Sequence, residues 1–457
     1  MTRRAKILAL LTPALIAISA CSLAPKYERG ELPVAETWPD GAPTTQDVHL
    51  KWRDLFVDPR LRKTIDLALA NNRDLRVAAL DIVKARAQYG IARADLLPSL
   101  DGTLSGNRSH TPVNGTTTGY TANLGLSWQV DLFGRVRSLN KAALESFFGS
   151  QENRNAVEIS LIGDTASAWI RLAADQDALR LTRDTLKLTK DNYDIAVGQA
   201  RIGTLSDLDL AQTKTEYETA RQTVAQAETA VDQDKDALVL LVGAGLPDDL
   251  LPDGLKAGVV AGNLPAGVPS QILLNRPDVL TAEHSLKAAN ADIGAARAAL
   301  FPSISLTGAA GSASRALGDL FKSGTGTWSY GASAAESLFA GGANINGVRS
   351  AKAGRDIALA QYEKSIQSAF RDVGDALAVR ARIDERLDAQ TQATDAAQTA
   401  FKLSQARYQT GADSYLTLLT AERTLYTSQQ TLISLQALRA TNLADLYQAL
   451  ADDESLN

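Results

Sequence analysis

The 457-residue sequence is poor in the residues that support most binding and catalytic sites. It has one cysteine, Cys21, and three histidines that are far apart along the chain, and aromatic residues make up only 5% of it. One cysteine cannot form an internal disulfide, and isolated histidines do not suggest a metal site. A net charge of −5 gives no reason to expect a nucleic acid as partner.

Motifs of catalysis are also missing. The sequence contains no nucleophile elbow of the GxSxG type, no phosphate-binding GxxxxGKS or GxxxxGKT loop, no HExxH and no CxxC. Carboxylate pairs such as Asp248-Asp249 lie in a proline-rich connector, where solvated charge is the expected role. We therefore expect no metal, no cofactor and no enzymatic activity.

The first 21 residues have the pattern of a targeting segment. A basic start precedes an apolar stretch that is too short to span a bilayer. The stretch ends in ISAC, which resembles the bacterial lipobox, whose cysteine is lipidated. We predict a signal peptide over residues 1–20 and a lipid anchor on Cys21, with an ordinary signal peptide as the alternative. Ser22 stands where an aspartate would resemble the inner-membrane retention signal, so the outer membrane is favoured.

Two phrases of the sequence are nearly the same. ARADLLPS ends at Ser99 and ARAALFPS ends at Ser303, and further landmarks follow both phrases at nearly the same spacing. The phrases DLFGRVRS and ARIGTLSDLDLAQ, for example, each have a partner in the second half of the chain. We interpret residues 70–243 and 274–451, roughly bounded, as two copies of one structural unit that arose by tandem duplication.

Each copy has a proline at which a helix is predicted to give way to a strand. Proline disfavours helix in the residue before it, so Pro98 and Pro302 mark helix-to-strand junctions. Apolar and polar residues alternate in YTANLGLSWQVD and again around Trp328, as they do in strands with one apolar face. Each copy thus contributes one strand hairpin, about 99–133 and about 303–339, and the chain has four strands.

The alternating strands have two interpretations. A transmembrane strand needs about 9–11 residues with an apolar outer face, which these strands fit, but a half-buried sandwich in a soluble protein shows the same alternation. Four strands cannot close a membrane barrel alone, and lipid does not tolerate open sheet edges. The membrane interpretation therefore requires an oligomer.

Long segments without proline follow both strand hairpins. The segment 136–200 alone would form a helix of about 100 Å. Apolar residues recur at every seventh position, which is typical of coiled-coil packing. Gly203 and Gly411 interrupt the pattern, so we expect the helices to reverse there and each copy to end in a long helical hairpin. The heptad positions are Leu172, Leu179, Leu186, Tyr193 and Ala200, then Leu210, Tyr217, Val224, Val231 and Leu238, and in the second copy Leu418, Leu425 and Leu432.

Charged and polar residues gather at both helical reversals. One interpretation is a solvated loop. If several chains bring the tips together around an axis, however, the same residues form a charged ring that narrows a pore, and ion pairs between tips would hold it shut. The residues are Arg201, Asp207 and Asp209 in the first copy and Arg407, Tyr408 and Asp413 in the second.

Taken together, these landmarks resemble the outer membrane factor family, the TolC-like proteins, in its lipidated NodT or OprM type. The resemblance covers essentially the whole mature chain and is carried by the lipobox, WRDLFVDPRLRKTIDLALANNRDLRVAAL, the two LPS/FPS steps, VDLFGRVRS and RYQTGADSYLTLLTAE. It implies a mainly α-helical fold and a homotrimer, in which four strands per chain complete one twelve-stranded transmembrane β-barrel on an α-helical tunnel through the periplasm.

The same resemblance implies a function and partners. The protein would be an outer-membrane exit duct in a Gram-negative bacterium, receiving substrate from an inner-membrane transporter through a periplasmic adaptor protein. In this family the hairpin tips close the periplasmic end of the tunnel. By motif, Tyr408 matches a position of the closing contacts and Leu416 a hydrophobic constriction. Thr420 stands where the family often has an aspartate of an acidic ring, so the aspartates of the two tips are the candidates for that charge.

The predicted organisation follows from these patterns. It consists of a signal peptide (1–20), a lipidated extended segment (21–53), a first repeat (54–243), a Pro/Gly-rich connector (244–270), a second repeat (271–451) and a tail (452–457). The helical hairpins span about 135–243 and 344–451, and we expect the extended segment and the connector to form a belt around the helices. The alternative function is a structural coiled-coil lipoprotein of the outer membrane without channel activity, which would have no need for strand hairpins.

Overall fold

The computed structural model describes residues 23–36, 38, 51–113, 115–256, 259, 270–452 and 456. Cys21, the predicted lipidation site, lies outside them. The chain divides into two compact units. One comprises Leu80–Glu152, Leu280–Lys364 and the described part of the first 31 residues, and the other comprises Leu32–Ala79, Asn153–Val279 and the described part of the last 93 residues, from Ser365 on.

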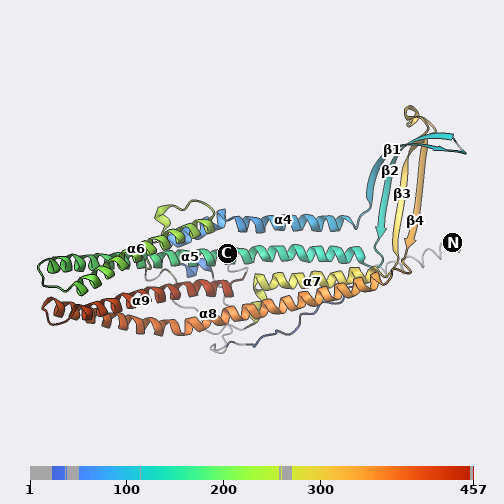
Figure 1. Cartoon of the computed structure of the whole chain (residues 1–457). Helices are drawn as coiled ribbons and strands as arrows, with labels where there is room; N and C mark the ends of the chain where they lie inside the picture. Colours follow the sequence, from blue (N-terminus) through green and yellow to red (C-terminus); the bar gives the residue numbers. More distant parts are fainter. Residues whose placement is uncertain are drawn as a thin grey trace. The chain divides into compact units, whose positions relative to one another are not determined.

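The two halves of the chain repeat one order of elements (Figure 1). The first half contains α2 (Trp52–Leu55), α3 (Pro59–Asn71), α4 (Arg73–Ala94), β1 (Ser99–Thr111), β2 (Gly115–Val130), α5 (Arg135–Arg201) and α6 (Asp207–Val242). After η1 (Asp248–Leu250) and η2 (Ser270–Asn275), the second half contains α7 (Pro277–Ala298), β3 (Ser303–Ser314), η3 (Leu317–Asp319), β4 (Gly326–Ala335), α8 (Ala343–Gln409) and α9 (Tyr415–Leu450). The helix α2 begins at Trp52, just before the predicted end of the extended segment.

Matching helices in the two halves have equal lengths. Helices α4 and α7 have 22 residues each, α5 and α8 have 67 each, and α6 and α9 have 36 each. This is what a duplicated unit predicts. Within the described ranges, none of the helices combines the length and the apolar character that crossing a membrane would require.

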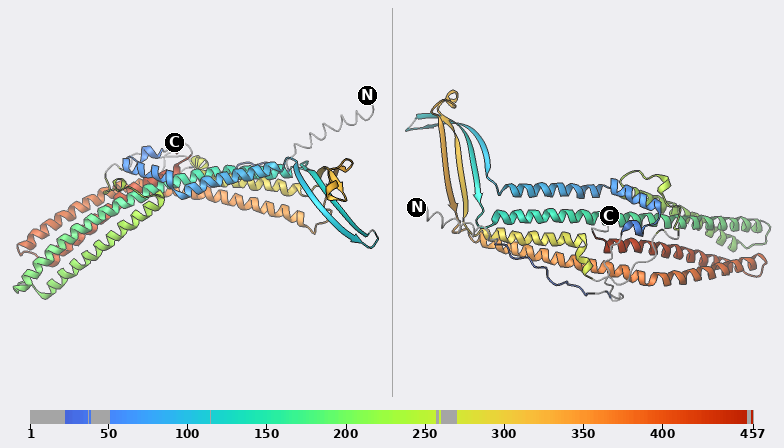
Figure 2. Two further views of the ribbon diagram at one scale, coloured as in Figure 1. Left: turned by 90° about the horizontal axis from the view of Figure 1, so that it is seen from above. Right: turned by 180° about the vertical axis from the view of Figure 1, so that it is seen from behind.

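The four strands form a single antiparallel sheet in the order β1-β2-β3-β4 (Figures 1 and 2). Val130 of β2 pairs with Ile304 of β3, so the strand hairpins of the two copies lie side by side. Both faces of β1 and of β4 are exposed, and Trp328 is 76% exposed. A sandwich would cover one face, so the described part of the chain does not form the half-buried sandwich that the alternation also allowed.

Both helix-to-strand junctions lie at the same end of this sheet. Strand β1 begins one residue after Pro98, and β3 begins one residue after Pro302. Ser99 lies opposite Ser127, which lies opposite Thr307, four residues beyond the first residue of β3. The two junctions are therefore staggered along the strands, as they are in a sheet whose strands tilt.

The heptad stripes are buried to different degrees. The predicted stripe of α6 is buried at Val224, Val231 and Leu238. In α5 the predicted positions after Leu172 are only half-buried. The buried positions of this arm lie three residues further along, at Thr182, Thr189 and Ala196. Small side chains on the covered face let neighbouring helices approach closely, which the apolar periodicity alone did not indicate.

A buried asparagine joins two helices end to end in the first copy. Asn72 donates through Nδ2 to the carbonyl oxygen of Leu241 at 2.8 Å, and its Oδ1 accepts from the backbone N–H of Leu75 at 2.9 Å. One side chain thus satisfies a free carbonyl at the end of α6 and a free N–H at the start of α4. Gly243 terminates α6 in the left-handed conformation, with φ of 71°.

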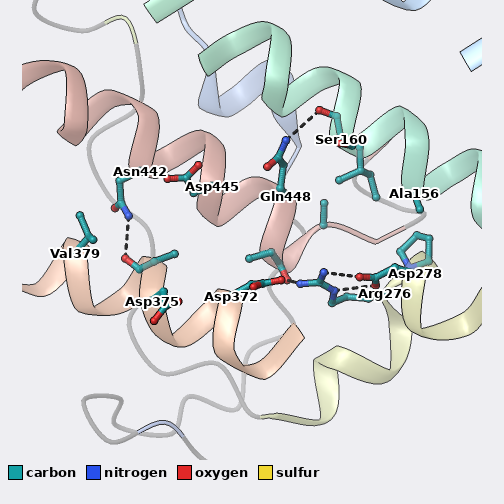
Figure 3. Close-up of a pocket in the computed structure, with 15 residues that line it drawn as sticks. Ala156, Ser160, Arg276, Asp278, Asp372, Asp375, Val379, Asn442, Asp445 and Gln448 are labelled. Atoms are coloured by element: carbon teal, nitrogen blue, oxygen red, sulfur yellow. Dashed lines mark hydrogen bonds and ion pairs between the residues drawn. The ribbon is translucent and has the colours of Figure 1, made fainter. Parts of the chain in front are cut away.

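An arginine makes the matching connection in the second copy. Arg276 donates through Nη1 to the carbonyl oxygen of Ala449 in α9 at 2.7 Å and through Nη2 to Asp278 in α7 at 2.6 Å. Figure 3 shows these groups beside a cavity of about 540 Å³, which is also lined by Asp372, Asp375 and Asp445. Burial and the neighbouring charge of Asp164 raise the pKa of Asp445.

A buried glutamate of α7 holds the extended segment 23–36. The side chain of Glu283 is 2% exposed and accepts hydrogen bonds from Tyr27 Oη at 2.8 Å and from Arg29 Nε and Nη2 at 2.9 and 2.6 Å. Lys287 Nζ lies 3.3 Å from the same carboxylate. Burial alone would raise the pKa of Glu283, but the hydrogen bonds from Arg29 and Tyr27 outweigh it and lower the pKa to about 2. We call this contact the Glu283 clasp.

Candidate gate at the helical hairpin tips

The chain reverses at Gly203 and Gly411 with the same backbone geometry. Both glycines adopt positive φ, 78° and 73°. The N–H of Thr204 donates to the carbonyl of Gln199, and the N–H of Gly203 donates to that of Ala200, each at 3.0 Å. At the second tip, the N–H of Ala412 donates to the carbonyl of Arg407, and the N–H of Gly411 donates to that of Tyr408. This pair of backbone hydrogen bonds is the Schellman motif. Glycine is favoured in it because a residue with a side chain is strained at positive φ.

A serine then starts each returning helix. Ser206 accepts from the N–H of Asp209 at 3.2 Å, and Ser414 accepts from the N–H of Thr417 at 3.3 Å. These bonds satisfy N–H groups that have no partner within the helix. The two tips therefore have one backbone design, and their side chains make the difference between them.

The second tip carries an ion pair across its own turn. Arg407 donates to Asp413 through Nε at 2.7 Å and through Nη2 at 2.9 Å. The guanidinium lowers the pKa of Asp413, and the carboxylate raises the pKa of Arg407. Arg201 and Asp207 of the first tip are exposed, and no ion pair to either is found in the part of the chain that the structure describes.

Aromatic residues of the second hairpin face the first hairpin. Tyr408 and Tyr415 lie with ring centroids 5.7 Å apart. Burial, and then the charge of Asp209, raise the pKa of Tyr408. Tyr415 is hydrogen-bonded to Thr213 of α6, and its pKa is raised mainly by burial. Contacts between the two hairpins thus lie next to both turns.

The remaining predicted gate residues lie on one exposed face of α9. Leu416 is 61% exposed, and Thr420, one turn further along, is also exposed. The hydroxyl of Thr420 donates to the carbonyl oxygen of Leu416 at 2.8 Å. Neither side chain contributes to the buried core of its own chain, so both remain available to line a pore.

The structure adds three charged residues that the sequence analysis missed. Arg423 of α9 forms an ion pair with Glu216 of α6, which connects the two helical hairpins. The adjacent Glu422 is 7% exposed. Burial, and then the charge of Glu216, raise the pKa of Glu422 to about 7. Glu422 lies four residues after Leu418 and three before Leu425, so its place on the apolar stripe was the signal that could have revealed it.

Comparison with known proteins agrees with the duplication. The family model described as outer membrane efflux protein matches this chain twice, at residues 64–244 and at 268–452. The two matches together cover most of the chain and coincide with the two copies of the repeated unit. The chain belongs to the outer membrane efflux protein family. It is accordingly an outer-membrane protein of a family of efflux channels, not of enzymes.

Relatives within this family are similar over nearly their whole length. A probable efflux pump outer membrane protein of Pseudomonas putida, TtgC, is 44% identical, with 95% of this chain and 93% of the relative covered. The outer membrane protein OprJ of Pseudomonas aeruginosa is 37% identical with the same coverage.

Solved structures of outer membrane efflux proteins have the same fold. The open state of the MtrE outer membrane channel of Neisseria gonorrhoeae superposes with a TM-score of 0.84 at 40% identity, covering 94% of this chain and 98% of MtrE. A structure of CusC, in a study of transmembrane channel formation, gives 0.85 at 36% identity, covering 94% and 100%. The chain therefore has the fold of the TolC-like channels, with its long helices in the α-helical tunnel and its four strands in the β-barrel.

Proposed function

We propose that this chain forms the exit duct of a tripartite efflux or export system, gated at its helical tips. The observation that carries the proposal is the four-stranded sheet with two unpaired outer edges, attached to two long helical hairpins. A coiled-coil spacer lipoprotein would have no use for a sheet that exposes Trp328 and Tyr330. A membrane channel needs such a sheet, because apolar side chains can face lipid there.

The sheet edges support a homotrimer. Strands β1 and β4 are outermost in the sheet of one chain, and unpaired strand edges are not tolerated in lipid. Three sheets placed edge to edge, β4 against the β1 of the next chain, would close a barrel of twelve strands. The stagger of four residues between Ser303 and Thr307 is compatible with the strand tilt that closure requires.

The partners follow from the kinds of protein that this chain is similar to. The relatives are named as outer membrane proteins of efflux pumps, and a pump needs a part that uses energy, of which this chain shows no motif. We propose an inner-membrane transporter and a periplasmic adaptor, with the adaptor docking at the hairpin tips. Substrate choice would then belong to those partners.

The gate is assigned to the contacts at the tips. Arg407 and Asp413 fix the second turn, and Tyr408 packs beside Tyr415, which is hydrogen-bonded to Thr213 of the first hairpin. Opening would require the second hairpin to move away from the first, with loss of the contacts between Tyr415 and Thr213 and between Arg423 and Glu216. Leu416 and Thr420 are the candidates for the narrowest part of the pore.

The lipid anchor is a separate part of the proposal. Cys21 would become the first residue of the mature chain and carry the acyl groups. A Cys21→Ser variant should therefore lose incorporation of labelled palmitate. More than one acyl chain is needed for stable attachment. The wild-type protein, labelled in parallel, is the control, and label on the Cys21→Ser variant would refute acylation at this site.

Single-channel recording tests the proposed function directly. The purified protein should migrate as a trimer that dissociates on heating, and in planar bilayers it should conduct ions with rare openings. A protein that stays monomeric and shows no conductance at any pH would refute the duct and favour the structural lipoprotein.

A further inference from the structure

A cavity of about 310 Å³ lies between the two helical hairpins, near the tips. Helix α5 contributes only threonines to its wall. Helix α6 contributes Glu216, Ala220 and two threonines, and α9 contributes Leu419, Glu422, Arg423 and Tyr426. The volume is in the range of sites that take small molecules, and apolar groups form most of the lining, as is usual for such sites.

Glu422 lies in the wall of this cavity without a partner. The residue is 7% exposed, and no hydrogen bond or ion pair to its side chain is found among the residues that the structure describes. The neighbouring Arg423 is already bound to Glu216. Two carboxylates thus face one guanidinium. Because Glu216 binds it, the carboxylate of Glu422 has no cationic partner within the described ranges. A buried carboxylate without a partner is costly, so a donor placed beside it would be stabilised.

The threonines of the wall cannot supply that donor. Thr185 donates its hydroxyl proton to the carbonyl of Leu181 at 2.9 Å, and Thr223 donates to Thr219 at 2.9 Å. Thr182, Thr189 and Thr219 donate to carbonyls of their own helices in the same way. Each hydroxyl proton is therefore in use, and what these side chains offer the cavity is oxygen lone pairs and methyl groups.

The occupant must then bring its own N–H or O–H groups and a positive charge. A metal ion is a poor match, because the described residues contain no group of three histidine, cysteine, aspartate or glutamate side chains that could hold one. The cavity is also wide for a single ion, and Leu419, Ala220 and the Tyr426 ring give it apolar walls. We propose that this cavity binds a small organic ammonium, whose N–H groups donate to Glu422 while its apolar body packs against Leu419 and Tyr426.

Occupation of the site would connect the two hairpins. Its walls come from α5 and α6 of the first copy and from α9 of the second, so a ligand there adds contacts between parts that must separate in the proposed opening movement. Bound ammonium therefore favours the closed duct. This consequence rests on the proposed function, but the binding itself does not.

The site also predicts how binding depends on pH. The charged and titratable groups around Glu422 are Glu216 on α6 and Arg423, Tyr415 and Tyr426 on α9, and α5 adds none to the cavity. The pKa of Glu422 is about 7, so the carboxylate is mostly protonated at pH 6 and mostly ionised at pH 8. A primary amine stays charged over this interval. Its apparent affinity should therefore be about tenfold higher at pH 8 than at pH 6.

The test uses the purified full-length protein and 2-phenylethylamine as the probe, titrated by calorimetry. We expect saturable binding with the stated pH dependence. Glu422→Gln should weaken binding at pH 8 by tenfold or more. Glu218→Gln, which alters an exposed α6 glutamate paired with Arg221, is the matched control and should bind like the unmodified protein. The uncharged analogue 2-phenylethanol should bind more weakly and without dependence on pH.

Three results would overturn the proposal: no saturable binding of 2-phenylethylamine, equal binding of the amine and the alcohol, or unchanged binding by a Glu422→Gln variant that still migrates as a trimer. If that variant fails to assemble, the comparison of the two probes on the unmodified protein decides. Single-channel recording of the same preparation separates the two proposals. Conductance without amine binding refutes only the site, and amine binding without any conductance refutes only the duct.

Discussion

Arg407 holds Asp413 with two hydrogen bonds across the turn of the second helical hairpin, at 2.7 and 2.9 Å. The matching positions of the first hairpin, counted from the turn glycines, are Gln199 and Leu205, which cannot form an ion pair. The two tips thus share one backbone, but only the second has a charged contact across its turn. The duplication supplied the same turn twice, and the later divergence of its side chains made the two hairpins unequal.

Breaking this ion pair should make the channel leak. We expect Arg407→Ala and Asp413→Asn each to increase the frequency of spontaneous openings in planar bilayers, because the second turn loses its fixed shape. The melting temperature should change little, since Arg407 is largely exposed and an ion pair with an exposed partner adds little to stability. Lys402→Ala, an exposed change on the same helix, is the control. The exchange Arg407→Asp with Asp413→Arg should restore closure, and a leak as high as in the single variants would argue against the pairing.

The Glu283 clasp should control access of proteases to the N-terminal segment. Glu283→Gln removes the charge that Arg29 and Tyr27 bind, and hydrogen bonds to a charged group contribute roughly 1.5 kcal/mol or more, so trypsin should cleave after Arg29 about tenfold faster. The matched control is Glu28→Gln, because Glu28 is exposed and pairs only with Lys26 among the described residues. Equal cleavage of the two variants would contradict the clasp.

The same clasp has a defined response to acid. The pKa of Glu283 is lowered in the folded protein to about 2, from an ordinary value of 4.5. Its contribution to stability is therefore complete above about pH 4.5 and is lost as the pH falls from there toward 2. Cleavage of the unmodified protein should approach that of Glu283→Gln only within this window, which an acid-active protease such as pepsin can report.

Local signals in the sequence predicted the fold well. Pro98 and Pro302 limit the helices before the strands, Gly203 and Gly411 mark the reversals, and the heptads indicate long paired helices, because each of these effects acts over a few residues. Because the unit is duplicated, each of these landmarks occurs twice in the sequence, and the two occurrences support the same prediction. The face of α5 that is covered was not predicted, because threonine and alanine at Thr182, Thr189 and Ala196 carry no strong apolar signal.

The candidate site was predicted less completely, for a related reason. Its residues were named as a set, but the pairing of Arg407 with Asp413 within one turn depends on how Gly411 redirects the chain. The contacts of Glu216 with Arg423 and of Thr213 with Tyr415 join residues about 200 positions apart, and no local pattern reports such neighbours. Glu422 was missed because a glutamate in a helix is usually solvated.

The junction of α6 with α4 should depend on one glycine. Gly243 has positive φ, and a Cβ there would lie 2.7 Å from the carbonyl oxygen of Asn71. Gly243→Ala should therefore destabilise the protein by about 1–2 kcal/mol from backbone strain alone, with a further cost from the clash. The control is Gly245→Ala, because a Cβ at Gly245 meets nothing within 4 Å and its φ is not positive. Equal melting temperatures for the two variants would show that the junction tolerates a side chain.

A pair of aspartates makes the helical region less stable than it could be at neutral pH. Asp234 of α6 is buried beside Asp175 of α5, and burial and the hydrogen bond to that second carboxyl raise the pKa of Asp234 to about 6. A folded-state pKa above the ordinary value of 3.8 means that stability is lost as the pH rises from about 4 to 6, and the loss is complete at higher pH. Arg171 lies 3.2 Å from Asp234 but is largely exposed, so its charge does not cancel this cost.

Asp234→Asn should therefore raise the melting temperature, because the amide keeps the shape of the side chain and cannot ionise. The gain should be small at pH 4, grow between pH 4 and 6, and be complete at pH 8. Asp232→Asn, an exposed change two residues earlier on α6, should show no such dependence. A gain of equal size at pH 4 and pH 8 would mean that Asn stabilises this site by packing, whereas a lower melting temperature at pH 8 would mean that the ionised carboxylate is well accommodated after all.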